Sequence, residues 1–200
     1  MQVDDFVLKK PSEVSITNFT GTILVVCDGL QSSVFSFCKD MKIIKEIYKT
    51  IKNHPAQGSI KNEAYTKINF PTNLSARELV FIHSSQSKTI TARGKLGSRV
   101  SRLIEATESL LICEPKFMVP DFLMGVILPS YTFTKYKSRN DNANYKCVIL
   151  GPKSIEKTIE RKIKSICSGV FYARDLTNEP SNHLNTETFS EKLKQLQNLG

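Results

Sequence analysis

The sequence predicts an α/β fold, with a mixed, mostly parallel sheet flanked by helices and followed by one long connecting helix. Short β-branched runs alternate along the 200-residue chain with segments whose apolar residues recur every three or four positions, as on one face of a helix. Strands separated by helices form layered α/β domains, and a chain of this length suffices for one well-buried domain and a short piece of another. We therefore expect a single core with an appendage.

The first half of the chain contains three predicted strands and one predicted helix. Residues 22–29 are a β-branched run that closes on a glycine, which is typical of a buried strand. After a loop at residues 55–59, residues 65–70 alternate between polar and apolar, and residues 78–85 are a second apolar run, so both are expected in the sheet. Residues 32–54 are expected to form a helix with these apolar residues on one face: Val34, Phe37, Met41, Ile44, Ile47 or Tyr48, and Ile51.

The second half of the chain continues the alternation of predicted helices and strands. A loop that carries basic residues is expected before a helix over residues 97–113, and residues 121–136 have a helix-like pattern that Pro129 should kink or interrupt. Residues 144–152 are a predicted strand, and residues 154–175 are the clearest helix in the chain. The two helices are expected to bury these side chains: Val100, Leu103, Ile104, Leu110 and Leu111 in the first, and Ile155, Ile159, Ile163, Ile166 and Val170 in the second.

The long helix should end near Pro180, because a proline disfavours helical backbone in the residue before it. Asn185 or Thr186 is then expected to cap a last short helix. These boundaries predict an N-terminal α/β domain over residues 1–152, a connector helix over residues 153–175 and the start of a second domain over residues 176–200. Two further sets of side chains are expected on these helices: the ion pair Glu160 and Lys164 in the connector, and the apolar residues Phe189, Leu193 and Leu196 in the last helix.

The composition is typical of a soluble globular protein. Apolar residues make up 40% of the chain and charged residues 24%, which excludes disordered and fibrous classes. No stretch approaches the roughly 18–20 apolar residues of a membrane span. Asp4 and Asp5 stand where a secretory signal would carry positive charge, so a cytoplasmic location is expected. The odd number of widely spaced cysteines predicts buried free thiols: Cys27, Cys38, Cys113, Cys147 and Cys167.

The formal charge of +9 is distributed unevenly. Between Glu78 and Glu105 there are no acidic residues, and a second basic cluster follows residue 134. Such a surface can meet nucleic acid or an acidic partner, but without interleaved aromatic residues it is more often a solvated face. The cations concerned are Lys88, Arg93, Lys95, Arg99 and Arg102 in the first window, and Lys135, Lys137 and Arg139 in the second.

The residue chemistry does not by itself identify an enzyme. His54, His83 and His183 lie far apart, and none is in a His-Glu-x-x-His or Cys-x-x-Cys frame that would place two metal ligands together. Residues 93–98, with two glycines between basic residues, fit neither the Walker nor the dinucleotide-binding pattern, which favours a plain basic loop over an anion site. A Gly-x-Ser-x-Gly nucleophile elbow does not occur in the sequence.

Two stretches carry a family resemblance. The run ARDLTNEPSNHLNTETF, residues 173–189, resembles the segment that opens the catalytic domain of the leucyl (cytosol) aminopeptidases, although Glu187 replaces the family's proline. About fifty residues upstream, residues 125–138 resemble the family's helix that ends in Ser-Tyr-x-Phe-x-x-Tyr-Lys, although Thr134 and Pro129 depart from it. The matching positions are Ser130, Tyr131, Phe133, Tyr136 and Lys137 in the upstream stretch, and Arg174, Asp175, Asn178, Glu179, Pro180 and Asn182 in the other.

The resemblance implies a macro-like N-terminal α/β domain, a connecting helix and a C-terminal domain with two divalent metal ions, manganese or zinc. In that family the metals are held by lysine, aspartate and glutamate side chains that would lie beyond Gly200, and a metal-bound water cleaves N-terminal residues from peptides. The resemblance also implies a homohexamer in the full-length protein. No catalytic or metal-binding residue is therefore expected within these 200 residues.

The signature positions in residues 174–182 have a structural interpretation that we favour over a catalytic one. Asn178, Glu179 and Asn182 are suited to hold a chain reversal after a long helix through side-chain bonds to backbone. The alternative for the whole chain is a non-enzymatic module for assembly or nucleic-acid binding, since some bacterial relatives use the N-terminal domain to bind DNA. The basic window would then be the contact surface.

Overall fold

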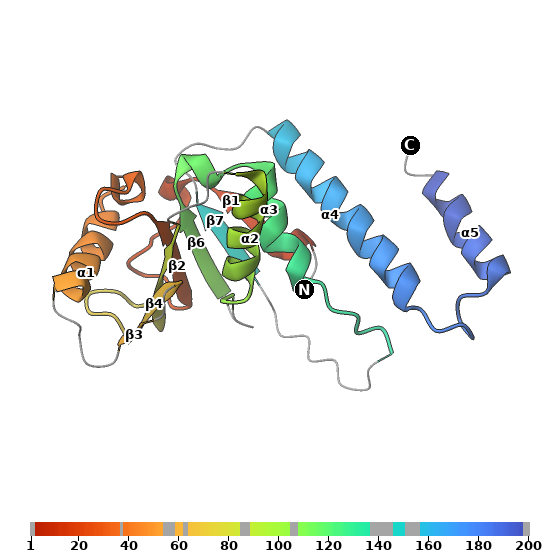
Figure 1. The fold of residues 1–200 in the computed structure, drawn as a ribbon, viewed down its shortest axis with the longest axis horizontal. Helices are drawn as coiled ribbons and strands as arrows, with labels where there is room; N and C mark the ends of the chain where they lie inside the picture. Colours follow the sequence, from red (N-terminus) through yellow and green to blue (C-terminus); the bar gives the residue numbers. More distant parts are fainter. Residues whose placement is uncertain are drawn as a thin grey trace.

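The computed structural model describes residues 3–36, 38–53, 59–61, 64–84, 89–104, 108–136, 146–150 and 157–197. They form a layered α/β body from which one long helix leads to a last helix at the far end of the molecule (Figure 1). The strands are β1 Phe6–Lys9, β2 Thr22–Cys27, β3 Ser59–Lys61, β4 Tyr65–Asn69, β5 Glu78–His83, β6 Glu108–Cys113 and β7 Lys146–Leu150. The helices are α1 Met41–Asn53, α2 Ile90–Ser101, α3 Pro120–Ile127, α4 Lys157–Asn178 and α5 Thr186–Leu196, with 3-10 turns η1 Val3–Asp5, η2 Pro11–Glu13, η3 Ser33–Ser36, η4 Pro115–Phe117 and η5 Leu128–Ser130.

The described strands form one sheet of seven in the order β1-β7-β6-β2-β5-β4-β3. The first five of these run parallel to one another, and β4 and β3 add an antiparallel edge. The central strand β2 pairs with β5 on one side and β6 on the other, so that Ile23 lies opposite Leu79 and Leu110. The prediction of a mixed, mostly parallel sheet is confirmed.

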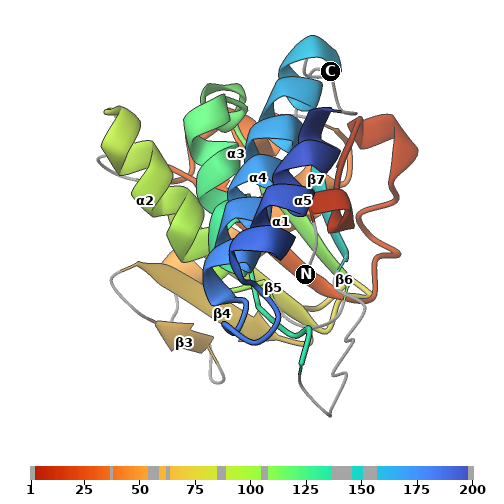
Figure 2. The same cartoon turned by 90° about the vertical axis from the view of Figure 1, so that its right-hand side faces the viewer.

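Alternate side chains of the central strands enter two separate cores, one on each face of the sheet. Leu24 and Val26 of β2 face the core covered by α2, α3 and part of α4, whereas Ile23 and Val25 face the core covered by α1. Figure 2 shows α2, α3 and α4 side by side on one side of the sheet. Because β2 is buried on both faces, its sequence is continuously apolar rather than alternating.

The helix expected over residues 32–54 is shorter than predicted, since α1 begins only at Met41 and residues 33–36 form the separate turn η3. Two tertiary contacts hold the intervening segment away from a helix. The Asp40 carboxylate accepts a hydrogen bond from the Ile16 N–H at 3.2 Å, and the Phe35 ring packs against Tyr48 at 5.7 Å between centroids. Phe37 lies outside the described residues.

The prediction of a helix over residues 97–113 is correct for residues 97–101, which lie in α2, and wrong for residues 108–113. Helix α2 begins earlier, after Thr89, whose hydroxyl accepts a hydrogen bond from the Ala92 N–H at 3.1 Å. The part with Leu110 and Leu111 is instead strand β6, and both side chains are fully buried on opposite faces of the sheet. A short apolar run fits a buried strand and a helix face equally well, so periodicity alone favoured the wrong element.

The second half otherwise follows the predictions closely. Helix α3 gives way to the turn η5 around Pro129, and strand β7 occupies the middle of residues 144–152. The long helix α4 runs to Asn178, and its Glu160 and Lys164 form the expected ion pair at 3.3 Å. The boundary expected at residues 152 and 153 lies outside the described part of the chain.

The apolar stripe predicted for the long helix is only partly correct. Ile163 and Cys167 face the core, whereas Ile159 and Ile166 are 36% and 42% exposed. Ile155 lies outside the described residues. Helix α4 therefore meets the α/β body along a narrow strip and leaves a neighbouring apolar flank uncovered.

The expectation of buried, unpaired cysteines is confirmed for four of the five. Cys27, Cys113, Cys147 and Cys167 are buried free thiols, and Cys38 is a half-buried one. Burial raises the pKa of the Cys27 and Cys147 thiols to about 12, so both stay protonated near neutral pH. None of the helices in the described ranges is long and apolar enough to cross a bilayer.

Helices α2 and α3 pack unusually closely, because glycines face one another at their contact. A Cβ built on Gly97 would lie 2.3 Å from the Phe122 carbonyl oxygen, and one on Gly125 would lie 2.5 Å from the Gly94 carbonyl oxygen. Neither position has room for a side chain. The glycines of residues 93–98 thus serve helix packing, and these residues form the middle of α2 rather than the expected basic loop.

We predict that Gly97→Ala destabilises the protein by about 1–3 kcal/mol, because the added methyl group forces α2 and α3 apart. Urea denaturation followed by circular dichroism measures the free energy of unfolding. Gly169→Ala is the matched control: nothing lies within 4 Å of a Cβ at Gly169 in α4, so the helix should gain up to about 1 kcal/mol. An unchanged stability of Gly97→Ala would contradict the close packing of the two helices.

Candidate functional site

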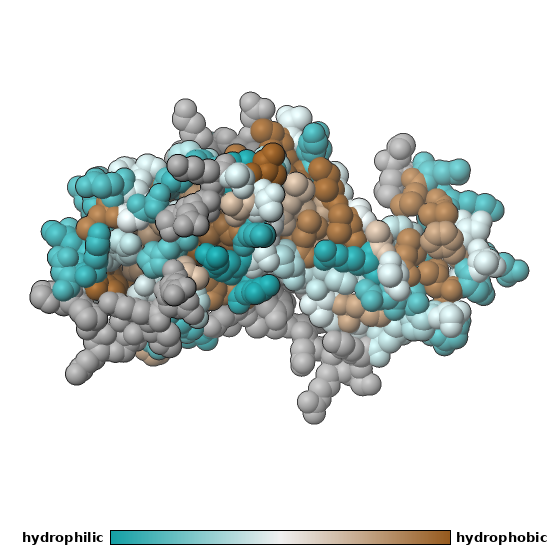
Figure 3. All heavy atoms as spheres, in the orientation of Figure 1, coloured by the Kyte–Doolittle hydropathy of each residue, from teal (hydrophilic) through white to brown (hydrophobic). Residues whose placement is uncertain are grey.

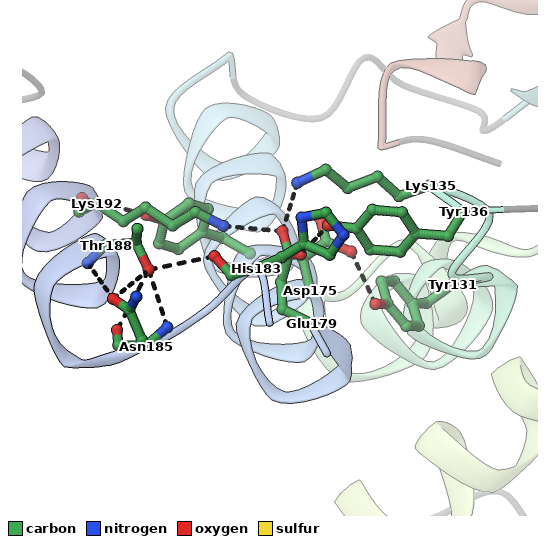
Figure 4. A network of polar contacts seen from close by, with 10 residues as sticks. Tyr131, Lys135, Tyr136, Asp175, Glu179, His183, Asn185, Thr188 and Lys192 are labelled. Atoms are coloured by element: carbon green, nitrogen blue, oxygen red, sulfur yellow. Dashed lines mark hydrogen bonds and ion pairs between the residues drawn. The ribbon is translucent and has the colours of Figure 1, made fainter. Parts of the chain in front are cut away.

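Three segments that are far apart in the sequence meet at the C-terminal end of α4. Residues 131–136, which follow η5, lie against the last turns of α4, and α5 approaches from the other side (Figure 4). We call this region the α4 junction. Its side chains are Tyr131, Lys135, Tyr136, Arg174, Asp175, Asn178, Glu179 and Lys192.

The Glu179 carboxylate is the centre of the junction. Its Oε1 accepts hydrogen bonds from the ammonium groups of Lys135 and Lys192, the latter at 2.8 Å, and its Oε2 accepts one from the Tyr136 hydroxyl. The Glu179 side chain is only 2% exposed. Hydrogen bonds from Lys135, Lys192 and Tyr136 lower the pKa of Glu179 to about 2. The carboxylate therefore stays ionised at neutral pH and is unsuited to general acid or base catalysis.

A second set of contacts fixes α4 to η5 and the segment after it. The Arg174 guanidinium donates to the Leu128 carbonyl at 2.6 Å and lies 5.5 Å from the centre of the Tyr131 ring. The Tyr131 hydroxyl donates to Asp175 at 2.7 Å, and the Asn178 amide donates to that hydroxyl at 3.3 Å. The two stretches that carry the family resemblance thus contact each other directly.

The chain reverses just after α4. The Pro180 carbonyl accepts hydrogen bonds from the N–H groups of His183 and Leu184, both at 2.9 Å, and Asn182 is exposed within this turn. The His183 ring stacks on Tyr136 with centroids 4.7 Å apart and planes 22° apart. Four of the six signature positions contact other junction residues through their side chains, whereas Pro180 and Asn182 lie in the turn.

Helix α5 begins at the expected cap. The Asn185 side chain accepts a hydrogen bond from the Thr188 N–H, and the Thr188 hydroxyl accepts one from the Asn185 N–H, both at 2.9 Å. This reciprocal capping box fixes the start of the helix. The Tyr172 hydroxyl then donates to the Lys192 carbonyl at 3.2 Å, which joins the middle of α5 to α4.

This arrangement suits the joining of segments better than catalysis. Both oxygens of Glu179 accept hydrogen bonds from side chains of the protein, and Asp175 accepts one at Oδ1 from Tyr131. Within the described ranges, no group of three His, Cys, Asp or Glu side chains is placed to hold a metal ion. The junction is therefore a polar link between the α/β body, α4 and α5.

The predicted basic surfaces are only partly preserved in the structure. Arg93 pairs with Asp121 of α3 at 2.8 Å, and Lys135 belongs to the junction. Lys95, Arg99 and Arg102 remain exposed on one face of α2 and its C-terminal end, at spacings of four and three residues. Lys88, Lys137 and Arg139 lie outside the described residues.

The two histidines in the described part of the chain, His83 and His183, belong to different regions of the fold. His83 ends β5, and its Nε2 lies 3.4 Å from the Thr66 hydroxyl. Burial lowers the pKa of His83, so the ring is neutral at physiological pH. His183 is in the turn after α4, and His54 lies outside the described residues.

Lys192 is the junction residue that sequence reasoning missed. It lies in α5 beside Leu193, and no local pattern links it to a glutamate 13 residues earlier. The pairing depends on the turn after Pro180, which brings α5 back toward the end of α4. The sequence feature that could have indicated this pairing is a lysine placed directly beside the apolar face of the last predicted helix.

No protein-family model matches the chain. Among curated proteins, the probable cytosol aminopeptidase of Cereibacter sphaeroides is 22% identical over 147 residues, which are 72% of this chain and 30% of that protein. The counterpart in Rhizobium leguminosarum bv. trifolii is 28% identical over 162 residues, or 72% of this chain and 32% of that protein. The counterpart in Phytoplasma mali is 34% identical over 88 residues, which are 40% of this chain and 18% of that protein.

Solved structures show the same fold. A mutant of tomato leucine aminopeptidase superposes with a TM-score of 0.63 and 16% identity, covering 97% of this chain and 42% of that one. Leucyl aminopeptidase from Trypanosoma brucei gives a TM-score of 0.55 with 10% identity, covering 94% of this chain and 39% of that one. The chain thus spans about a third or less of the length of these curated relatives and about two fifths of the solved chains.

We predict a pH-dependent effect for Glu179→Gln. The folded pKa of about 2 lies below the ordinary value of 4.5, so the ionised carboxylate contributes stability above about pH 4.5 that is lost as the pH falls toward 2. The variant should melt at a lower temperature than the wild type at pH 6, and the difference should disappear near pH 2. Glu46→Gln, at an exposed ion pair in α1, should change the melting temperature little. A difference that is equal at both pH values would contradict this role for Glu179.

Proposed function

Since the chain is homologous to cytosol aminopeptidases over most of its length, we propose that it is the N-terminal portion of a two-metal, leucyl-type aminopeptidase. The full-length protein would remove N-terminal amino acids from peptides. Residues 1–152 would be its N-terminal α/β domain, residues 153–175 its connector and residues 176–200 the start of the metallopeptidase domain. A cytoplasmic location and a homohexamer of the full-length protein belong to the same proposal.

The observation that carries the proposal is the uncovered apolar surface of α4 and α5. Phe189, Leu193 and Leu196 form one face of α5 and are 38–43% exposed. An isolated helix of 11 residues is only marginally stable in water, so a helix with this face needs a covering partner. Figure 3 shows hydrophobic surface along both helices.

A large groove separates the two helices. Its volume is about 1080 Å³, and its lining includes Ser165, Ser168 and Gly169 of α4 and Leu196 of α5. Small side chains on α4 leave room for a further segment of polypeptide. We propose that the C-terminal domain of the aminopeptidase fills this groove and covers the apolar faces beside it.

The two divalent metal ions of such an enzyme, manganese or zinc, do not fit the residues described. Both oxygens of Glu179 are occupied by protein donors, Asp175 accepts a hydrogen bond from Tyr131, and no described cluster offers three ligands. We therefore assign Arg174, Asp175, Asn178, Glu179, Pro180 and Asn182 a structural role in joining the two domains. Metal binding and the cleavage step would belong to residues outside this chain.

A second candidate is nucleic-acid binding by the exposed cations of α2. Lys95, Arg99 and Arg102 lie on one side of the molecule and have no ion-pair partner among the described residues. Phosphates could meet this row, as they meet basic helices elsewhere. This role could accompany the aminopeptidase assignment or replace it.

We predict that the 200 residues alone do not hydrolyse leucine p-nitroanilide in Mn²⁺ or Zn²⁺, whereas a longer protein that continues into the C-terminal domain does. Chelation with EDTA should abolish that hydrolysis, and added metal should restore it. Release of p-nitroaniline measures both. Hydrolysis by the isolated 200 residues, or a longer protein that stays inactive with either metal, would contradict the proposal.

The nucleic-acid alternative predicts strongly salt-dependent binding. If the three cations of α2 contact phosphates, the logarithm of the association constant for duplex DNA should fall with the logarithm of salt concentration, with a slope of about 2.7, or about 0.9 per phosphate. Fluorescence anisotropy between 50 and 200 mM salt, roughly the range in which such effects are large, measures the slope. A triple change of Lys95, Arg99 and Arg102 to glutamine should flatten it. A slope near zero in the wild type would exclude this role.

A further inference from the structure

Phe70 holds an unfavourable backbone conformation while its side chain points into solvent. Its φ is +49°, in the left-handed region that glycine adopts freely and bulky residues avoid, and it is 78% exposed. Its N–H donates to the Arg77 carbonyl at 2.8 Å and so closes the connection between β4 and β5. A glycine could make the same backbone bond without strain and without an exposed ring. The packing of the fold therefore gives no reason for a phenylalanine here, and such outliers cluster at ligand-binding positions.

A groove lies next to Phe70. It has a volume of about 610 Å³ and runs between α1 and residues 68–73. Ile43, Ile47, Ile51 and Ile68 give it an apolar lining, and Phe70 forms part of its wall. Helix α1, β3 and β4 lie at the opposite end of the molecule from α5, so this groove is separate from the surface assigned to the C-terminal domain (Figure 1).

The helix beside the groove is strongly cationic. Helix α1 contains four lysines and one acidic residue, Glu46, which also lines the groove and pairs with Lys49 at 3.9 Å. Lys42 lines the groove, and both it and Lys45 are exposed without a carboxylate partner among the described residues. An apolar groove with a cationic edge complements a segment that combines an apolar side chain with carboxylates.

We propose that the groove between α1 and the β4–β5 connection binds a short acidic segment of a partner protein. One apolar side chain of that segment packs between Phe70 and Ile47, and a neighbouring carboxylate pairs with Lys42. A second copy of this chain fits less well, because two lysine-rich α1 helices would face each other in a chain whose net charge is already +9. The isoleucine lining likewise fits an apolar side chain rather than a phosphate backbone.

We predict that Phe70→Gly makes the protein more stable and weakens peptide binding in the groove. The substitution relieves the strained backbone, so the melting temperature should rise by at least a degree. It also removes the aromatic wall, so peptide affinity should fall at least tenfold. If Phe70 served only the fold, its replacement would not raise the melting temperature while lowering peptide affinity.

A library of random 12-residue peptides displayed on phage and panned on the wild-type chain supplies the probe. The enriched peptides should carry a Leu, Ile or Phe within two residues of an Asp or Glu. Fluorescence anisotropy should then show at least a tenfold loss of affinity in Phe70→Gly and at least a threefold loss in Lys42→Glu. Lys95→Glu, the same charge change on α2, and Leu193→Ala, an exposed apolar residue on α5, should bind within twofold of the wild type.

Three outcomes would overturn the proposal. The first is a selection that enriches no peptides, and the second is enriched peptides that bind Phe70→Gly as tightly as the wild type. The third is a wild-type chain that is dimeric by light scattering and becomes monomeric in Phe70→Gly, because the groove would then be occupied by a second copy.

Discussion

The buried carboxylate of Glu179 is the interaction on which the far end of the molecule depends. Removing a charged group from water is costly unless it is fully paired, and here each oxygen accepts hydrogen bonds from donors on other segments. Lys135 and Tyr136 come from the segment after η5, and Lys192 comes from α5. One side chain just after α4 thereby joins the segment after η5 to α5.

The two ends of the chain differ in how they are stabilised. The α/β body encloses two apolar cores and buries β2 on both faces, as a domain that folds on its own does. Helix α5 has no buried residue and is held by its cap, by Lys192 and by the Tyr172 hydroxyl. Polar contacts of this kind fix the direction of α5 but bury little of its apolar surface. Such a helix is suited to linking the α/β body to a second domain. This contrast supports our proposal that the chain continues into a second domain.

Much of the fold was predictable because it depends on local patterns. Strands β2, β4, β5 and β7, the break at Pro129 and the cap at Asn185 all follow from short runs of sequence. The helix over residues 97–113 was predicted wrongly because the run around Leu110 and Leu111 fits a helix face as well as a central strand. The junction was recognised only as two separate motifs, since the contacts of Glu179 with Lys135 and Lys192 depend on chain reversal. The left-handed backbone at Phe70 had no signal either, because the alternating run that contains it resembles an ordinary strand.

Amide hydrogen exchange in Glu179→Ala tests most directly whether this carboxylate holds the end of the molecule in place. Our account predicts that α5 and the turn before it lose protection, because the charges of Lys135 and Lys192 no longer meet a common partner. Strands β2, β5 and β6 should exchange as slowly as in the wild type, since their cores do not include the junction. Unchanged exchange in α5, or an equal loss of protection throughout the sheet, would contradict the account.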